Sequence, residues 1–130
     1  MIQADKLKKC TNRFAQESDI LAVWLLGSAQ TEQMHSESDV DFAVLYTRGH
    51  IRDFDQSSSL ISDLEAILGR PVDLGKLNTQ NLIYSHEAIS KGQSIYNREP
   101  VQTSRFVEQV FAMYFDLKQS RKVVEDAYCA

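Results

Sequence analysis

The most constraining feature of this 130-residue chain is a Gly-Ser pair followed, ten residues later, by an Asp-x-Asp triplet. Gly27 and Ser28 end an apolar run that begins at Ile20, and the triplet Asp39–Asp41 opens a second apolar run that ends at Tyr46. Short apolar runs bounded by glycine or polar residues are typical of buried strands. The pattern therefore predicts a strand, a turn, a polar loop and a second strand.

The two carboxylates of the triplet are expected to point to the same side, because side chains alternate along a strand. Asp39 and Asp41 are then roughly 6.6 Å apart along the backbone, and both can reach a hard cation such as Mg2+. Gly27 lets the backbone approach a ligand closely, and Ser28 adds a hydroxyl, so the turn can hold a phosphate. Two simpler interpretations stay open: a plain turn at a strand end, and two solvated carboxylates at the mouth of a strand.

The combination of Gly-Ser, ten residues and Asp-x-Asp resembles the signature of the nucleotidyltransferase superfamily related to DNA polymerase beta. The short chain narrows the resemblance to the minimal nucleotidyltransferases (MNT), many of which are antitoxins paired with HEPN ribonuclease toxins. The resemblance covers residues 20–77 and implies an α/β (α+β) fold, a small mixed β-sheet with helices packed on it. It also implies Mg2+-dependent transfer of AMP from ATP, with two Mg2+ ions, to a toxin hydroxyl that is expected to belong to a tyrosine.

A third carboxylate is assigned with the help of the same resemblance. Val72 and Leu74 are expected to face the core from a strand within Arg70–Leu77, which turns Asp73 to the opposite side. The family carries its third carboxylate on this strand, so Asp73 is expected to be a metal ligand and the base for the attacking hydroxyl. The implied site comprises the catalytic and metal-binding residues Asp39, Asp41 and Asp73 and the nucleotide-binding residues Gly27 and Ser28.

The loop between the two motifs departs from the family pattern. Relatives carry Arg soon after the Gly-Ser pair, whereas this chain has Gln30 and Gln33, which weakens the case for a cationic triphosphate clamp. His35 is expected to be a surface residue. Arg48 and Lys76 are candidate phosphate contacts elsewhere in the chain.

The charge balance constrains the partners. With 14 basic and 18 acidic residues, the chain has a net charge of −4, whereas proteins that mainly grip nucleic-acid backbones need a basic surface. A nucleotide substrate or a basic partner protein suits this charge better. The longest apolar run, Ile20–Leu26, is too short to span a membrane, and no signal-peptide pattern opens the chain. We therefore expect a cytoplasmic protein with free thiols at Cys10 and Cys129.

Residues 1–130 are expected to form a single domain. Helical periodicity and helix breakers predict helices over 2–17, 53–68, 78–91 and 101–127, and a small edge strand over 92–97.

The last two helices carry specific expectations about packing. In the third helix, Leu82, Ile83 and Ile89 are expected to point inward. The last helix has an apolar face that core packing explains better than a docked partner does. This face contains Val107, Val110, Tyr114, Leu117 and Val124 and is widened by Phe106, Phe111 and Phe115.

Two other functions stay open at this point. A non-catalytic binding module would neutralise its partner by covering the partner's active site, with the carboxylates kept as a relic or a structural cation site. A small-molecule nucleotidyltransferase, such as the enzymes that modify aminoglycosides, would carry an extra domain for which these residues leave no room.

Overall fold

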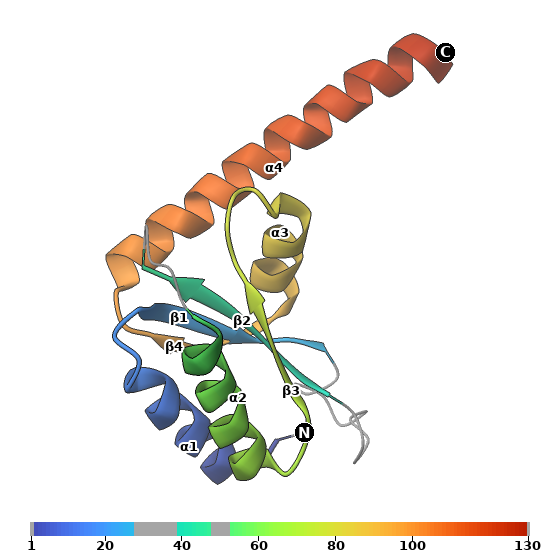
Figure 1. Ribbon diagram of the computed structural model, residues 1–130. Helices are drawn as coiled ribbons and strands as arrows, with labels where there is room; N and C mark the ends of the chain where they lie inside the picture. Colours follow the sequence, from blue (N-terminus) through green and yellow to red (C-terminus); the bar gives the residue numbers. More distant parts are fainter. Residues whose placement is uncertain (1, 28–38, 48–52, 130) are drawn as a thin grey trace.

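The computed structural model describes residues 2–27, 39–47 and 53–129. Its strands form one mixed sheet. Its order is β3-β2-β1-β4, with β1 at Ile20–Leu25, β2 at Val40–Tyr46, β3 at Val72–Lys76 and β4 at Gln93–Asn97. β1 pairs antiparallel with β2 and with β4, whereas β2 pairs parallel with β3. The expected small mixed sheet is confirmed (Figure 1).

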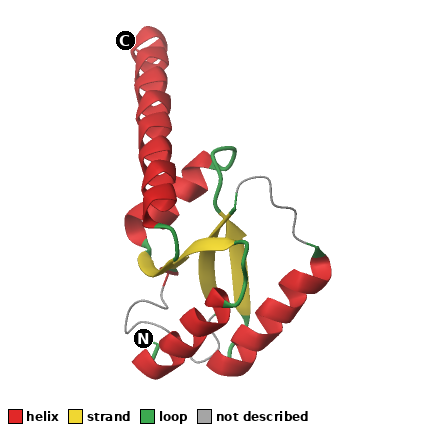
Figure 2. Cartoon of the chain, turned by 90° about the vertical axis from the view of Figure 1, so that its left-hand side faces the viewer, coloured by secondary structure: helices red, strands yellow, loops and turns green. Residues whose placement is uncertain are grey.

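Helices cover both faces of the sheet, as Figures 1 and 2 show. On one face lie α1 (Ala4–Ala15) and α2 (Phe54–Leu68), and on the other lie α3 (Leu82–Lys91) and α4 (Pro100–Cys129). This arrangement confirms the expected α+β fold.

The central strand β1 is buried on both sides. Val23 and Leu25 pack with the helices α1 and α2, whereas Ala22 and Trp24 pack with α3 and α4. A strand covered on both faces needs apolar side chains at every position, which explains why the run shows no polar alternation.

The connection from α2 to β3 sets the position of the parallel strand pair. Asp53 caps the start of α2 by accepting a hydrogen bond from Gln56 N (2.7 Å), and Gly69 ends it with a left-handed φ of 67°. The chain then turns into β3, where the carbonyl of Pro71 accepts from Val40 N (2.8 Å). A precise helix end therefore fixes where β3 meets the start of β2.

Arg98 ties the end of β4 to the end of α1. Its Nη1 donates to the Ser18 carbonyl (2.7 Å), and its Nη2 donates to the carbonyls of Ala15 (3.1 Å) and Glu17 (2.9 Å). Its Nε donates to the hydroxyl of Tyr96 (3.1 Å). Because the last carbonyls of a helix lack partners within the helix, a cation there satisfies them and favours the helix dipole.

The expectation for the inner side of α3 is wrong for Ile83, which is 52% exposed. The buried residues of α3 are Ser85 and Ala88. These small side chains let the helix lie close against the sheet, so the larger Ile83 is turned to solvent.

The expectation that core packing explains the apolar face of α4 is confirmed only for the first part of the helix. Val110 is fully buried, but Phe111, Phe115 and Val124 are 42%, 59% and 56% exposed. A 30-residue helix is about 45 Å long, whereas strands of this size span about 17–23 Å. α4 therefore extends past the sheet that would have covered it (Figures 1 and 2).

Among the described residues, no helix is both long enough and apolar enough to cross a membrane.

Cys10 lies in the core as a free thiol, as expected, whereas the expectation for the Cys129 side chain lies outside the part that the structure describes. Burial raises the pKa of Cys10 to about 11, so at neutral pH the thiol is protonated and shielded.

In a Cys129→Ser variant, we expect Cys10 to react with a thiol reagent at least about 100-fold more slowly in the folded protein than in denaturant. Rapid labelling of the folded chain would contradict the buried position.

Candidate functional site

Three carboxylates gather where β2 and β3 begin. Asp41 of β2 is the register partner of Asp73 of β3 in the parallel pair, and Asp39 immediately precedes β2. Neighbouring strands lie about 4.8 Å apart, so the side chains of Asp41 and Asp73 extend side by side from the same face of the sheet. The structure thus places Asp39, Asp41 and Asp73 at one edge of the sheet.

Gly27 lies beside this edge because β1 ends next to the start of β2. Leu26 N donates to the Asp41 carbonyl (2.9 Å) and so places the following residue next to the Asp41 side chain. Gly27 has a φ of 64°, and a β-carbon there would lie 4.0 Å from Asp41 Oδ2. A side chain at this position would be strained by the positive φ, and its β-carbon would lie against the carboxylate, so glycine suits this position.

The other residues of the predicted turn and loop lie outside the described residues. These are the nucleotide-binding candidate Ser28, the loop residues Gln30, Gln33 and His35, and the phosphate-contact candidate Arg48.

The carboxylates affect one another's protonation. Partial burial raises the pKa of Asp41 above its ordinary value, and the negative charges of Asp73 and then of Asp39 raise it further. Asp41 is open to solvent on one side, so the protein removes only part of its hydration. The edge therefore holds a concentration of negative charge that a cation would relieve.

The donor chemistry of this edge fits Mg2+. Among the residues that the structure describes, no three His, Cys, Asp or Glu side chains converge closely enough to hold a metal in their present positions. Mg2+ does not require such a cage, because it usually keeps several waters and takes one or two carboxylates together with substrate phosphates. Asp41 and Asp73, paired in register, supply carboxylates of this kind.

Tyr84 of α3 also reaches this site, and the sequence analysis missed it. A β-carbon on Gly75 would overlap the Tyr84 hydroxyl and ring, so the glycine lets the ring lie on β3. Burial raises the pKa of Tyr84, and the charges of Asp41 and then Asp73 raise it further. The available signal was a glycine inside a strand, two residues from Asp73 on the same face, since such a glycine often marks a close approach.

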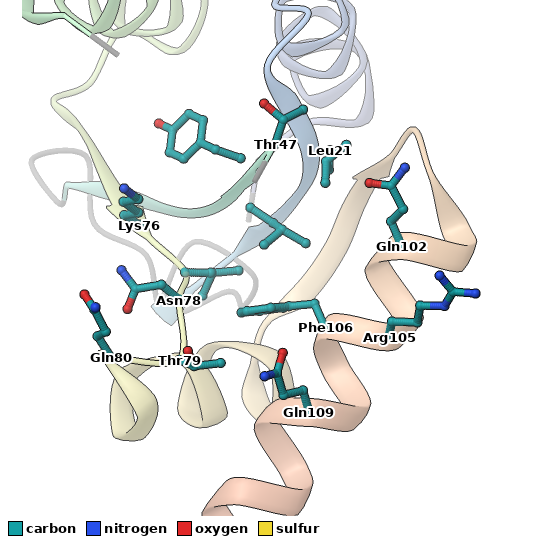
Figure 3. Close-up of a pocket in the computed structure, with 13 residues that line it drawn as sticks. Leu21, Thr47, Lys76, Asn78, Thr79, Gln80, Gln102, Arg105, Phe106 and Gln109 are labelled. Carbon is teal, nitrogen blue, oxygen red and sulfur yellow. The ribbon is translucent and has the colours of Figure 1, made fainter. Parts of the chain in front are cut away.

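A pocket of about 640 Å³, lined by both polar and apolar side chains, lies at the other end of β2 and β3. It opens between the loop after β3, with Asn78 and Gln80, and the α4 residues Gln102 and Gln109, while Phe106 points into it (Figure 3). None of the three carboxylates lines this pocket.

Lys76 lines the same pocket. It lies three residues along β3 from Asp73, which is about 10 Å. The structure therefore places this predicted phosphate contact away from the carboxylates.

The sequence matches the protein family described as Polymerase beta, Nucleotidyltransferase, over residues 8–101. No curated protein matches it.

Several solved structures are similar in fold over nearly the whole chain. A toxin–antitoxin structure with AMP-PNP has 22% identity and a TM-score of 0.70, covering 97% of this chain and 98% of that chain. The toxin–antitoxin MntA-HepT has 20% identity and a TM-score of 0.70, covering 98% and 100%. A tri-AMPylated Shewanella oneidensis HEPN toxin in complex with MNT antitoxin has 20% identity and a TM-score of 0.71, covering 99% and 100%.

Replacing Asp41 by Asn should stabilise the folded protein. Because its pKa is raised in the fold, ionised Asp41 destabilises the folded state at neutral pH. We expect Asp41→Asn to increase the free energy of unfolding by on the order of 0.5 kcal/mol, the scale of solvent-screened charge pairs. The gain should vanish as the pH falls below about 4, where the carboxyl is protonated in both states. Denaturant unfolding at several pH values measures it, and Asp116→Asn on the exposed side of α4 is the matched control.

The contact between Gly75 and Tyr84 can be tested with a double-mutant cycle. Gly75→Ala should destabilise the protein because the new methyl group displaces the Tyr84 ring. In a Tyr84→Ala background the same change should cost about 1 kcal/mol less. In a Tyr96→Ala background the cost should be unchanged, and equal costs in all three backgrounds would show that the ring does not lie on β3.

Proposed function

Because this chain belongs to the polymerase beta nucleotidyltransferase family, we propose that it is an MNT antitoxin that transfers AMP from ATP to its partner. The acceptor is a hydroxyl of a cognate HEPN toxin, most simply that of a tyrosine, and the modified toxin is inactive. The observation that carries this proposal is the register pairing of Asp41 with Asp73 beside Gly27, with Asp39 at the same edge.

Two of the structural neighbours support the choice of substrate and partner. One is a toxin–antitoxin structure with AMP-PNP, and the other contains a tri-AMPylated HEPN toxin with an MNT antitoxin. Both match this chain along nearly its full length, α4 included. ATP and a HEPN protein are therefore the substrate and partner to test first.

The residues of the edge have distinct proposed roles. Asp39, Asp41 and Asp73 would hold Mg2+ together with the triphosphate, and Gly27 and Ser28 would bind the departing phosphates. When bound, Mg2+ neutralises negative charge on the attacking and leaving oxygens.

Asp73 accepts the proton of the acceptor hydroxyl as its oxygen bonds to the α phosphorus. The bond from that phosphorus to the bridging oxygen of the β-phosphate breaks, and pyrophosphate leaves.

A second candidate function is a non-catalytic antitoxin that inhibits the toxin by forming a complex. Two observations favour it: the described carboxylates do not converge as a ready metal cage, and the chain has Gln30 and Gln33 where relatives carry Arg. Under this alternative the partner is covered but not modified.

Incubation of the full chain with its HEPN partner, Mg2+ and ATP labelled in the adenine separates the two functions. We expect label on the partner. Intact-mass measurement should resolve it into whole AMP units, and peptide fragmentation should place them on a tyrosine. The Asp39→Ala, Asp41→Ala double variant should label at least about 100-fold more slowly, since even outer-shell changes at metal sites cost 10–100-fold.

Asp55→Ala is the matched control because it removes one exposed carboxylate at the start of α2, outside the carboxylate edge and α4, and it should label like the wild type. Equal labelling by the double variant, or no label with wild type, would exclude the enzymatic function. Inhibition of the toxin without any label would establish the second candidate.

A further inference from the structure

The C-terminal half of α4 makes few packing contacts with the rest of the described residues. The helix contacts α3 and β1, and its buried residues, Thr103 and Val110, lie in its first eleven positions. Beyond them, Tyr114 stacks on His86 of α3 with ring centroids 3.6 Å apart. From residue 115 to 127 every described side chain is exposed or half-exposed, and the helix extends away from the sheet (Figure 1).

We call residues 111–127 the projecting half of α4, and its apolar residues point to several sides of the helix. Each residue advances about 100° around a helix. Phe111 and Phe115 therefore share one side, and Met113, Leu117 and Val124 lie roughly opposite. Val123, which is 68% exposed, lies between these two sides. The exposed fractions are 42% for Phe111, 38% for Met113, 59% for Phe115 and 56% for Val124.

A helix of this composition is poorly suited to stand alone in water. Phenylalanine, tyrosine and valine are weaker helix formers than alanine, leucine or lysine, and short isolated helices are marginal even with good formers. A solvated helix normally has one polar side, but here apolar side chains face outward in opposite directions. The sequence of the projecting half fits a helix that another protein covers.

The surface area of the projecting half indicates how a partner would contact it. The projecting half is about 25 Å long and about 10 Å across, so one side offers about 400 Å² and both sides about twice that. A stable specific interface buries about 800 Å² per partner. Contact along one side would fall short of this, whereas a groove that encloses both sides would reach it.

The charges on the projecting half cancel. It carries three basic residues, Lys118, Arg121 and Lys122, and three acidic residues, Asp116, Glu125 and Asp126. An interface built on it would depend on apolar burial rather than on net charge, and its affinity would change little with salt.

We propose that the projecting half of α4 inserts into an apolar groove of the HEPN partner, a docking contact separate from the carboxylate edge. The inference rests on the proposed function for the identity of the partner. A second copy of this chain is a poorer occupant. Two such helices side by side would cover one side each, and a seam through Tyr114, Leu117 and Val124 would also include the charged Arg121.

Binding to the HEPN partner should be measured by calorimetry with the full chain carrying Asp39→Ala and Asp41→Ala, so that no transfer occurs. Phe115→Lys and Val124→Lys, made singly, change opposite sides of the helix. Each should weaken binding at least about tenfold, because a groove contacts both sides. Phe54→Lys, at an 83% exposed position at the start of α2, is the matched control and should stay within about twofold.

Hydrogen exchange supplies a readout that does not depend on affinity. The amides of residues 115–127 should exchange fast in the isolated chain and become protected in the complex, whereas those of β1 should be slow in both. Unchanged exchange in the complex would overturn the proposal.

The remaining outcomes are also decisive. If only one of the two α4 variants weakens binding, a one-sided contact replaces the groove. If neither does, or if the chain alone is a dimer that Phe115→Lys dissociates, the proposal is wrong. The wild-type chain could also fail to label the partner although both α4 variants weaken binding. That result would overturn the enzymatic function but not the docking contact.

Discussion

The parallel pairing of β2 with β3 holds Asp41 and Asp73 side by side, and the geometry of the carboxylate edge depends on this contact between like charges. The repulsion is tolerated because the neighbouring strand positions are apolar and buried. Phe42 and Val44 are fully buried, and burial of one such side chain contributes about 1.5–3 kcal/mol. A solvent-screened pair of like charges costs less than about 1 kcal/mol. Burial of apolar side chains therefore outweighs the repulsion between Asp41 and Asp73 and keeps β2 and β3 in this register.

Much of this edge could be predicted from the sequence because the relevant signals are local. An uninterrupted apolar run indicated β1, and strand alternation placed Asp73 opposite Val72 and Leu74, as the structure shows. The position of Tyr84 could not be predicted, because it depends on how α3 packs against Gly75. Periodicity gives the residues that share a helix side, but it does not give the extent of the surface they meet. For this reason the exposure of Phe115 was not predicted.

α3 connects the carboxylate edge with the helix that we propose as the docking element. Tyr84 lies against β3 near the carboxylates, and His86, two residues later, stacks on Tyr114 of α4. Phe111 meets the same imidazole ring edge-on, with centroids 5.1 Å apart. A partner that grips α4 would therefore be held at a fixed orientation relative to the carboxylates, because one short helix contacts both.

The pairing of β4 with β1 has a consequence for the growing chain. β1 ends at Leu25, but the strand that closes its second edge, β4, ends at Asn97, and the Arg98 contacts to the end of α1 come one residue later. During synthesis, the most apolar strand of the protein thus keeps an unpaired edge until most of the chain has left the ribosome. Open strand edges invite association with other chains. Fragments that stop short of β4 should be cleared or aggregate, so that the copies which persist in the cell are those that contain β4.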